Sequence, residues 1–541
     1  MTIPTHRPRS ARRIQQAQRR EEKTQRRQRR EAAEAILQEG AAQAAKADAQ
    51  MAAALAIEQA ALTDDEVREW RRDMDQRLLA LEKNADQNLG FIEEEIARGS
   101  REPLRLLAQR AAQAKANATP VECRKHHIPL QHTRALSRGV DSRFGRIEIY
   151  RSYGYCPQCD AWHFPADLVL GLNPHSPASP YVQEVTALLN TKMPSEQAVE
   201  VARRFGLELS RCRIHREAHR QGLKAQEVRT AQLAQLDSWE KIQELAGQSD
   251  APATGPFTLV IEIDAWNIRE RDDWGRTREA RQGALRQGKE APSKWHWVYV
   301  ATVFRLDHRG TSAADRPVIS RRRYASTRLS LEDLMRQLYR QAIDCGLGQA
   351  QEVLVIADGA LWIWKAVKDR FPEARCRLDL YHGDQHLWSV AHELYGKDTP
   401  EASQWVEPLL KQLHRDNTSA VIHSLSNIVT EVDDKLRKKV QEQITYFTHN
   451  QNRIHYRDVL AARKAVQKGT ATTQQKLKAN EPLGSGAIES TCRQYQCRFK
   501  RTGQFWSLQG DEALMCLETF WRNNRWHDLF PHARPPAFAN N

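Results

Sequence analysis

Thr258-Leu-Val-Ile-Glu-Ile-Asp264 and Val353-Leu-Val-Ile-Ala-Asp358 are the stretches of sequence that decide the fold. Each is an apolar, largely β-branched run that ends in an aspartate, a pattern typical of a buried strand with a carboxylate at its end. We expect these runs to be the first and fourth strands of a mixed five-stranded sheet in the order 3-2-1-4-5. Because strands one and four are neighbours in that order, Asp264 and Asp358 are expected to meet at one edge.

The other elements of this sheet domain follow from shorter signals. Ser330-x-x-Asp333 resembles a capping box and predicts the start of a helix. The expected strands are Phe257–Ile263, Trp295–Arg305, Val318–Tyr324, Glu352–Ala357 and Arg375–Leu380, and the expected helices are Leu331–Ile343 and Leu361–Phe371. This alternation predicts an α/β core.

A third acidic residue is expected beside the two aspartates. Two carboxylates held together repel unless cations separate them. Mg²⁺ prefers oxygen ligands, and a pair of ions about 3.5–4 Å apart can activate an attacking oxygen and stabilise a leaving one. Gly484-Ser-Gly-Ala-Ile-Glu489 is the best candidate, because its glycines allow the start of a helix to approach the sheet closely. A surface pair of Glu489 with Arg493 is the alternative, and the rival ligands are Glu262, Asp272, Asp273 and Asp384.

A separate cysteine pattern predicts a structural zinc site. Cys156-Pro-Gln-Cys159 is one ligand pair, and Cys123-Arg-Lys-His126 is the matching upstream pair. Zinc takes four sulfur or nitrogen ligands in a tetrahedron, and four protein ligands leave no open position for water. A small β-rich segment has little core of its own, so the metal would supply much of its stability. His127 and His163 are competing ligands.

The region that follows the cysteines has the pattern of a helix-turn-helix. Ser195–Phe205 predicts a helix with an apolar face, Gly206 ends it, and Ser210 can cap a basic second helix, Arg211–Gln221. The second helix of such a motif enters the major groove of DNA; a helical hairpin with a solvated basic face is the alternative. The DNA-binding candidates here and near the C-terminus are Arg211, Arg213, Arg216, Arg220, Arg493, Lys500, Arg501 and Trp506.

The composition favours a polyanionic partner. The 541 residues include 82 Lys and Arg against 68 Asp and Glu, a net charge of +14, and phosphate contacts with such a chain release counterions. No apolar run approaches the ~20 residues of a membrane span, and no secretory signal is evident. The nine cysteines are an odd number, which favours reduced thiols. We therefore expect a cytoplasmic protein of the bacterial nucleoid, although a basic ribosomal factor would have a similar composition.

Changes in composition and in hydrophobic pattern along the chain predict a multidomain α+β protein. The expected parts are an arginine-rich flexible arm (1–32), a long helical region with a possible oligomerisation role (33–118), a zinc ribbon (119–168), a helical DNA-binding domain (178–228), the first part of the α/β core (255–383), an all-helical insertion (384–480) and the last part of the core with the glutamate helix (481–530).

Taken together, these motifs resemble the DDE transposases of bacterial insertion sequences, which have a ribonuclease H-like core. The similarity is to the Kra group and, more distantly, to Mutator-type enzymes, and it covers roughly residues 120–530. The motifs that carry it are strand-Asp264, strand-Asp358-Gly359, Leu378-Asp-Leu-Tyr-His382, Gly484-Ser-Gly-x-x-Glu489, Tyr155-Cys-Pro-Gln-Cys159 and Trp506-Ser507. One departure is Ala265, where the family pattern has glycine.

The resemblance implies that Asp264, Asp358 and Glu489 hold two Mg²⁺ or Mn²⁺ ions. It implies DNA strand cleavage and strand transfer on double-stranded DNA, at terminal inverted repeats and at a target, by a homodimer or larger assembly. Asp379-x2-His382 matches a (C/D)-x2-H motif of Mutator-type enzymes. His382 could contact the scissile phosphate or act in proton transfer, or it could simply bond to Asp379. The alternatives are a ribonuclease H-like nuclease or resolvase without strand transfer, and a domesticated transposase that acts as a DNA-binding regulator.

Overall fold

The structure is a computed structural model that describes residues 64–83, 88–248, 255–271, 293–313 and 316–532, with a few isolated positions at 35–52, 282 and 286. By its internal contacts the chain forms two compact units, Met1–Gln183 with Glu200–Leu209 and Glu184–Val199 with Ser210–Asn541. The expected arm over residues 1–32 lies outside the described residues. None of the described helices combines the length and the apolar character that a membrane crossing needs.

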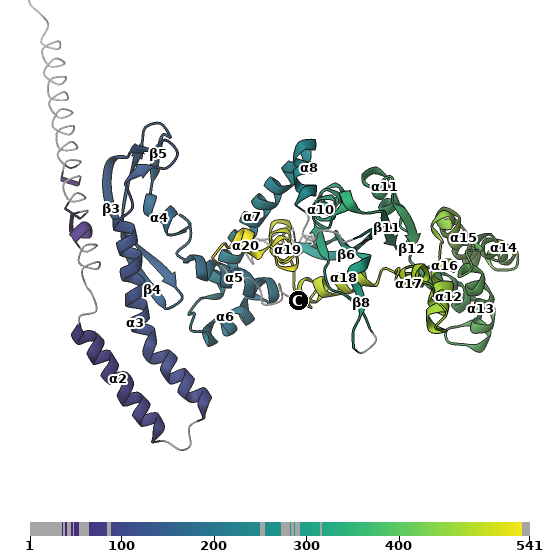
Figure 1. The fold of residues 1–541 in the computed structure, drawn as a ribbon, viewed down its shortest axis with the longest axis horizontal. Helices are drawn as coiled ribbons and strands as arrows, with labels where there is room; N and C mark the ends of the chain where they lie inside the picture. Colours follow the sequence, from purple (N-terminus) through teal and green to yellow (C-terminus); the bar gives the residue numbers. More distant parts are fainter. Residues whose placement is uncertain are drawn as a thin grey trace, which may run out of the picture. The chain divides into compact units, whose positions relative to one another are not determined.

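The first unit packs a long helix against a small antiparallel sheet (Figure 1). The side-chain amide of buried Gln113 in α3 bonds to both backbone groups of Tyr150, at 2.7 and 2.8 Å, and so joins helix to strand β4. Val140, Ile147 and Ile149 form the apolar core beneath the helix. The elements are α2 (Asp64–Glu82), α3 (Leu89–Asn117), β1 (Glu122–Cys123), β2 (Ile128–Pro129), β3 (Gln131–Ser142), β4 (Gly145–Cys156), β5 (Ala161–His163) and α4 (Pro165–Val169).

The second unit contains the mixed five-stranded sheet that the sequence predicts. Its strand order is β10-β7-β6-β11-β12. The first three strands in this order are antiparallel, and β6, β11 and β12 run parallel. The strands are β6 (Thr258–Arg271), β7 (Ser293–Arg305), β10 (Arg323–Thr327), β11 (Glu352–Ala357) and β12 (Arg375–Leu378). The first and fourth apolar runs are therefore neighbours, as expected.

Alternation along β6 decides which helices cover which face of the sheet. Leu259, Ile261 and Ile263 pack in one core with α10 (Leu331–Asp344) and α11 (Leu361–Arg370). Trp266 and Ile268 pack on the opposite face with α18 (Gly486–Phe499) and α19 (Leu508–Arg522). Successive side chains of a strand point to opposite faces, so Asp264 faces α18.

The remaining helices form the surroundings of the sheet. The expected insertion is helical throughout and has a core of its own (Figure 1). It consists of α12 (Leu380–Tyr395), α13 (Pro400–Leu413), α14 (Thr418–Val429), α15 (Asp434–Asn450), α16 (Arg457–Gln467) and α17 (Thr473–Ala479). The helices predicted around residues 180–224 are α5 (Pro180–Lys192), α6 (Ser195–Arg204) and α7 (Arg211–Ala234), followed by α8 (Trp239–Gly247); α20 (Trp526–Leu529) is near the C-terminus.

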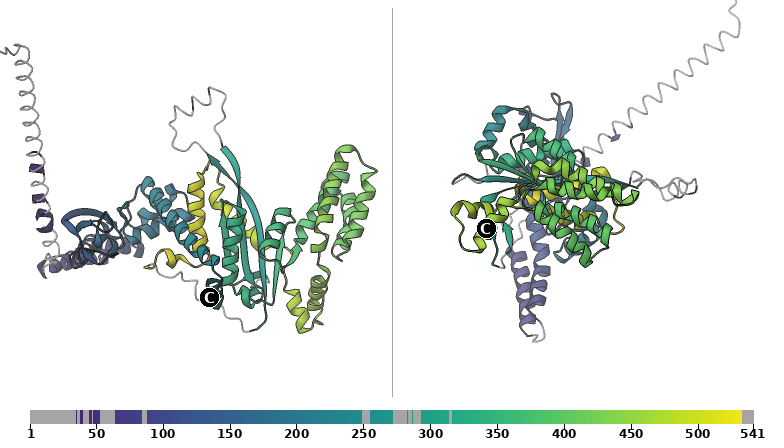
Figure 2. Two further views of the ribbon diagram at one scale, coloured as in Figure 1. Left: turned by 90° about the horizontal axis from the view of Figure 1, so that it is seen from above. Right: turned by 90° about the vertical axis from the view of Figure 1, so that its right-hand side faces the viewer.

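The prediction that Asp264 ends its strand was wrong. Strand β6 continues to Arg271, because its antiparallel pairing with β7 extends as far as Ser293 (Figure 2). The parallel neighbour β11 pairs only up to Glu262 of β6. Asp264 therefore lies just beyond the last β6 residue that pairs with β11, at a level where β6 is still paired with β7 and β7 with β10.

Two other strand boundaries also differ from the prediction. The third strand is Arg323–Thr327 and not Val318–Tyr324, because Val318 pairs with Gly310 in a separate hairpin of β8 (Arg309–Thr311) and β9 (Pro317–Ile319). The fifth strand ends at Leu378, because the carboxylate of Asp379 accepts the backbone N–H of His382 and caps α12. His382 therefore belongs to the first turn of a helix and not to a strand end.

Candidate active site

Three aspartates follow one another across neighbouring parallel strands. The parallel register of β11 on β6, continued by two residues, puts Asp358 level with Asp264. The register of β12 on β11, continued by one residue, puts Asp379 level with Asp358. Neighbouring strands lie about 4.8 Å apart, and paired residues point to the same face. The sheet thus presents a row of three carboxylates on the face that α18 covers.

Asp264 is held in a partly buried position with few hydrogen bonds. Its carboxylate accepts the backbone N–H of Ala265 at 2.6 Å and the thiol of Cys492, one turn beyond Glu489 in α18. Burial raises the pKa of Asp264, and the charges of Asp358 and Glu489 raise it further. The two acids predicted to share a site with Asp264 are therefore close enough to act on its ionisation.

Asp358 is fixed by the helical insertion, which the sequence analysis did not connect with the site. The hydroxyl group of Tyr446 in α15 donates to the backbone oxygen of Asp358 at 2.8 Å. The buried amide of Asn450 donates to the oxygen of Gly359 and accepts the indole N–H of Trp364. Gly359 has φ +100°, and a Cβ there would meet the Tyr446 ring at 2.7 Å. No local pattern at residues 446 and 450 could have indicated this contact.

Glu489 lies in the first turn of α18, whose start is tied to the sheet. The carboxylate of Glu262 accepts the backbone N–H of Ile488 at 2.8 Å and is 1% exposed. The backbone N–H and the hydroxyl of Ser485 both donate to Asp379. A Cβ on Gly484 would lie 2.5 Å from the Tyr381 ring and 3.2 Å from a carboxylate oxygen of Asp379, so the absence of a side chain favours this close approach. The close approach of helix and sheet predicted from the glycines is present.

His382 lies between two acids of this site. Its Nδ1 is 3.6 Å from a carboxylate oxygen of Asp379 and 3.7 Å from one of Glu489, and it has no hydrogen-bond partner among the described residues. The neighbouring carboxylate of Asp379 raises the pKa of His382, and Glu489 and Asp358 add to this effect. Burial raises the pKa of Asp379, but the hydrogen bonds from His382 and Ser485 outweigh it and leave that pKa below its ordinary value.

The predicted acidic residues do not all lie equally close to one another. The residues whose potential ligand atoms lie within 4.8 Å of one another are Asp379, His382 and Glu489. Glu489 is half exposed and leans toward His382, whereas Asp264 and Asp358 lie outside this group. Asp379 is thus a site residue that sequence spacing had placed only in a supporting motif.

The rival acids have other partners or cannot be placed. Glu262 binds the start of α18, and Asp384 pairs with His414 at 2.9 Å within the insertion. Asp272 and Asp273 lie outside the described residues. The hydrogen bonds of the predicted acids are local: Asp264 accepts the Ala265 N–H and the Cys492 thiol, and Asp358 accepts the Ala360 N–H at 3.0 Å.

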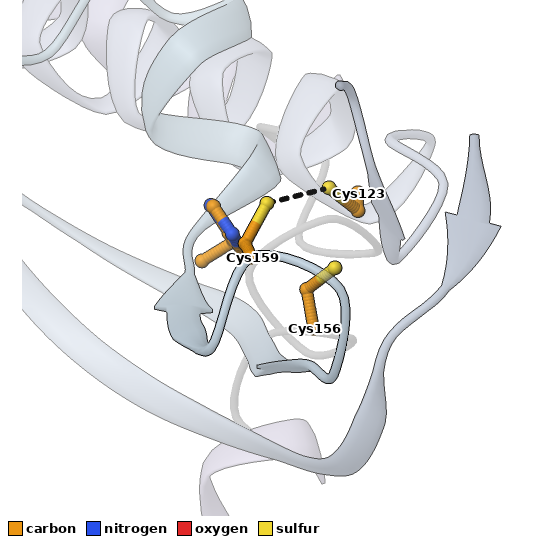
Figure 3. A group of neighbouring side chains, drawn as sticks. Cys123, Cys156 and Cys159 are labelled. Carbon is orange, nitrogen blue, oxygen red and sulfur yellow. Dashed lines mark hydrogen bonds between the residues drawn. The ribbon is translucent and has the colours of Figure 1, made fainter. Parts of the chain in front are cut away.

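The cysteines of the first unit converge, as Figure 3 shows for Cys123, Cys156 and Cys159. The sulfur atoms of Cys123 and Cys159 are 3.6 Å apart. Nδ1 of His126 lies 3.7, 3.5 and 3.4 Å from the sulfurs of Cys123, Cys156 and Cys159. Burial and the neighbouring thiols raise the pKa of Cys159 to about 11. The four predicted ligand groups therefore lie together.

His163 also comes within 4.8 Å of the three sulfurs, so two histidines compete for one position. A tetrahedron with zinc–sulfur bonds of about 2.3 Å and zinc–nitrogen bonds of about 2.0 Å has sulfur–nitrogen edges of about 3.5 Å. His126 matches those edges to all three sulfurs. His163, whose buried Nε2 has no hydrogen-bond partner among the described residues, is the second candidate for the same position. His127 has φ +52° in the turn after His126 and is not part of the group.

The basic residues of α7 have different surroundings from those of a freely exposed recognition helix. One side of α7 packs on α19, where Gly222 meets the backbone of Ala513. Arg211 pairs with Glu196 at 2.7 Å, and Arg220 pairs with Glu217. Arg216 is exposed, while Arg213 is half-buried. The helix is also longer than predicted, since it continues from Gln221 to Ala234.

The C-terminal candidates lie in α18 and in the segment after it. Arg493, Lys500 and Arg501 are exposed. Lys500 donates to the side chain of Asn267 in β6 at 3.0 Å. Trp506 is half-buried, and its indole N–H donates to the backbone oxygen of Phe499 at 2.8 Å. This hydrogen bond fixes the orientation of the Trp506 ring, so its side chain is not freely exposed to solvent.

Comparison with known proteins adds one similarity. Residues 319–527 match the Uncharacterised protein family (UPF0236). The matched region begins after Asp264 and includes Asp358, Asp379, His382 and Glu489. It covers less than half of the chain, and the description of that family assigns no activity. No curated protein matches the chain.

Proposed function

We propose that the chain is a DDE transposase that cuts and joins DNA in a metal-dependent reaction. The observation that carries this proposal is the position of Asp358, just after β11, level with Asp264 of the neighbouring parallel strand β6, on the face of the sheet covered by the helix that bears Glu489. The raised pKa of Asp264 reflects burial and the charges of the other two acids. A buried acid with a raised pKa beside other acids is typical of functional sites.

The topology of the sheet supports a ribonuclease H-like core. Numbered along the chain, its strands lie across the sheet in the order 3-2-1-4-5, in which the first three are antiparallel and the last two run parallel to strand 1. The helical insertion separates the strands from the helix with the third acid, as in the transposases that the sequence resembles. Fold alone does not establish an activity, so the proposal depends on the acids.

The residues at this site fit divalent cations with oxygen ligands. Asp264, Asp358 and Glu489 offer carboxylate oxygens, and a bound cation would offset both the burial and the neighbouring negative charges that raise the pKa of Asp264. Two Mg²⁺ or Mn²⁺ ions, when bound, would supply Lewis-acid activation of the attacking oxygen and stabilisation of the leaving oxygen. Asp379 accepts hydrogen bonds from His382 and Ser485 and is a further acidic residue of this site.

The chemistry requires two successive substitutions at phosphorus. Water attacks a phosphodiester, its P–O3′ bond breaks, and the strand ends in a free 3′-hydroxyl group. That hydroxyl then attacks a target phosphodiester, forms the joining bond and releases the target 3′-oxygen. His382, with its pKa raised by Asp379, is suited to hold or donate a proton at the leaving oxygen.

The proposal extends to a structural zinc ion and to DNA as the partner. Cys123, His126, Cys156 and Cys159 have the spacing that tetrahedral zinc requires. The net positive charge of the chain favours DNA as the partner, and its exposed cations include Arg216, Arg493, Lys500 and Arg501. Two DNA ends must meet during transposition, so we expect a homodimer or larger assembly on the DNA, in the bacterial cytoplasm.

The decisive experiment is a strand-transfer assay with the full chain and Mg²⁺ or Mn²⁺. The donor is a linear fragment carrying the DNA that flanks the gene on either side, and the target is a supercoiled plasmid. We expect Asp264→Ala and Asp358→Ala to abolish joined products. Asp369→Ala, an exposed aspartate of α11, is the matched control and should remain active.

Near-normal strand transfer by either site variant would refute the assignment. Cleavage of the flanking DNA without joined products would favour a nuclease or resolvase. Binding of that DNA without cleavage, unaffected by Asp264→Ala, would favour a DNA-binding regulator.

A further inference from the structure

The second unit contains a cavity that the proposed chemistry does not use. Its volume is about 700 Å³. One side is formed by the first half of α7 and the α5–α6 connection, and the other by Arg498 of α18 and the segment 503–510. Pockets of a few hundred to about 1,000 Å³ are the usual size for small-molecule and cofactor ligands. A duplex does not fit such a space, but a nucleotide does.

The charged groups that line the cavity are mainly cationic. Arg211, Arg216 and Arg498 contribute guanidinium groups, and Glu196 is the one acid among the lining residues. Glu196 is already paired with Arg211 at 2.7 Å. A net positive lining of this kind attracts an anionic ligand such as a phosphate ester.

The opposite wall is aromatic and held rigidly. Phe505 and Trp506 line the cavity. The backbone of Trp506 bonds to Arg269 and Arg271 of β6, at 3.2 and 2.9 Å, and its indole N–H is bound to Phe499. The guanidinium of Arg271 lies 3.5 Å from the centre of the Phe505 ring. Aromatic faces next to cations are the usual means of holding unpaired bases.

The same strand connects this wall to the proposed active site. Asp264 and Arg269 are five residues apart on β6, which at about 3.4 Å per residue corresponds to roughly 17 Å. DNA rises about 3.4 Å per base pair, so the cavity lies roughly five base steps from a phosphate at Asp264. A bound DNA strand could reach both places.

We propose that this cavity receives one or two unpaired nucleotides of the DNA strand, with the backbone phosphate at the arginines of α7 and a base against the 505–506 wall. This inference rests on the DNA substrate of the proposed function. It revises the helix-turn-helix interpretation, because the segment 503–510 faces the basic side of α7 across the cavity. The first half of α7 then contacts a single strand rather than the major groove of a duplex.

The test uses two exposed cysteines, one inside and one outside the cavity. Cys212 lines it, and Cys497 of α18 does not. Cys212→Trp fills space without changing charge, and Cys497→Trp is the matched control. Binding of a fluorescein-labelled single-stranded oligothymidylate, and of a duplex of equal length, is measured by anisotropy with EDTA present. Thermal unfolding checks that each variant folds.

We expect Cys212→Trp to weaken oligothymidylate binding by roughly tenfold or more, since stacking and phosphate contacts are both lost. Duplex binding and the Cys497→Trp control should change by less than about twofold. Arg216→Glu should have the same selective effect, with Arg415→Glu of the insertion as its charge-matched control. These last variants keep the test decisive if Cys212→Trp does not fold.

Two results would overturn the inference: unchanged oligothymidylate binding by both cavity variants, or an equal loss of duplex binding, which would restore the groove-binding role of α7. The assay is separate from catalysis. Selective binding without strand transfer in Mg²⁺ would contradict the proposed function and leave the cavity assignment standing; strand transfer without selective binding would do the reverse.

Discussion

The hydroxyl group of Tyr446 donates a hydrogen bond to the backbone oxygen of Asp358 over 2.8 Å, although 88 positions separate the two residues in the chain. Tyr446 belongs to α15 of the helical insertion, and its ring also stacks on His386, with centroids 3.7 Å apart. Because the carbonyl that it binds is that of a proposed metal ligand, the insertion acts as a brace for the active site. Its position between the sheet and α18 in the sequence thus has a structural purpose.

Tyr446→Phe removes this hydrogen bond and keeps the ring. We expect cleavage to slow by roughly tenfold, which corresponds to about 1.4 kcal/mol, because the turn at Asp358 loses its fixed orientation. The Mg²⁺ concentration for half-maximal rate should rise, an effect that a general loss of stability would not produce. Tyr395→Phe, on the exposed side of α12, is the control. An unchanged metal requirement in Tyr446→Phe would contradict the bracing role.

Glu262 can be separated from the metal-binding acids by a pair of substitutions. Its carboxylate accepts the Ile488 N–H, and burial raises the pKa of Glu262 to about 8. Glu262→Gln keeps an acceptor and should retain most of the strand-transfer activity. Glu262→Ala leaves the N–H unsatisfied and should lower the free energy of unfolding by about 1–3 kcal/mol. If Glu262→Gln folds normally but loses all activity, Glu262 is itself a metal ligand.

These residues show what the sequence could and could not predict. The apolar runs before Asp264 and Asp358 predicted two strands of the central sheet, since a near-continuous apolar run is typical of a strand that is buried on both faces. The extension of β6 was missed, although Trp266, Ile268 and Glu270 are buried in strict alternation. The sequence shows this alternation of apolar and polar residues, but the prediction placed the end of the strand at Asp264.

Contacts between distant segments were not predictable from local patterns. Tyr446 and Asn450 look like ordinary helical residues until the insertion packs beside Gly359. Asp379 was read as part of a strand end, whereas aspartate is also a favoured helix N-cap residue, which is how the structure uses it. The convergence of Cys123, Cys156 and Cys159 was predictable, because ligand spacing is a local property, but the spacing did not decide between His126 and His163 as the fourth residue.

The zinc site gives a prediction that distinguishes its two histidines. Metal content of the purified chain is measured by mass spectrometry, and folding by thermal unfolding. We expect zinc in the wild type, and loss of zinc with a lower unfolding temperature in Cys156→Ser and His126→Ala, because structural zinc contributes directly to folding. His163→Ala should retain the metal. Loss of zinc from His163→Ala but not from His126→Ala would exchange their roles, and a zinc-free wild type would remove the site.

A buried carboxylic acid away from the active site gives a prediction for pH. Asp511 in α19 is fully buried, and neither of its carboxylate oxygens has a hydrogen-bond partner among the described residues. Burial raises its pKa from 3.8 to about 9, and the nearby acids Glu270 and Glu512 add to this, while Arg328 opposes it. Asp511 is therefore protonated in the folded chain at neutral pH.

The direction of the pH effect follows from proton binding. Between pH 3.8 and about 9 the unfolded chain has released the proton of Asp511 while the folded chain keeps it. The free energy of unfolding therefore falls as pH rises through this window. Asp511→Asn removes the titration at nearly constant volume, so it should unfold at a higher temperature than the wild type at pH 8, with a difference that shrinks toward pH 4. Asp369→Asn, an exposed aspartate, should follow the wild type at both values; an Asp511→Asn curve parallel to the wild type would mean that this acid is ionised in the folded chain.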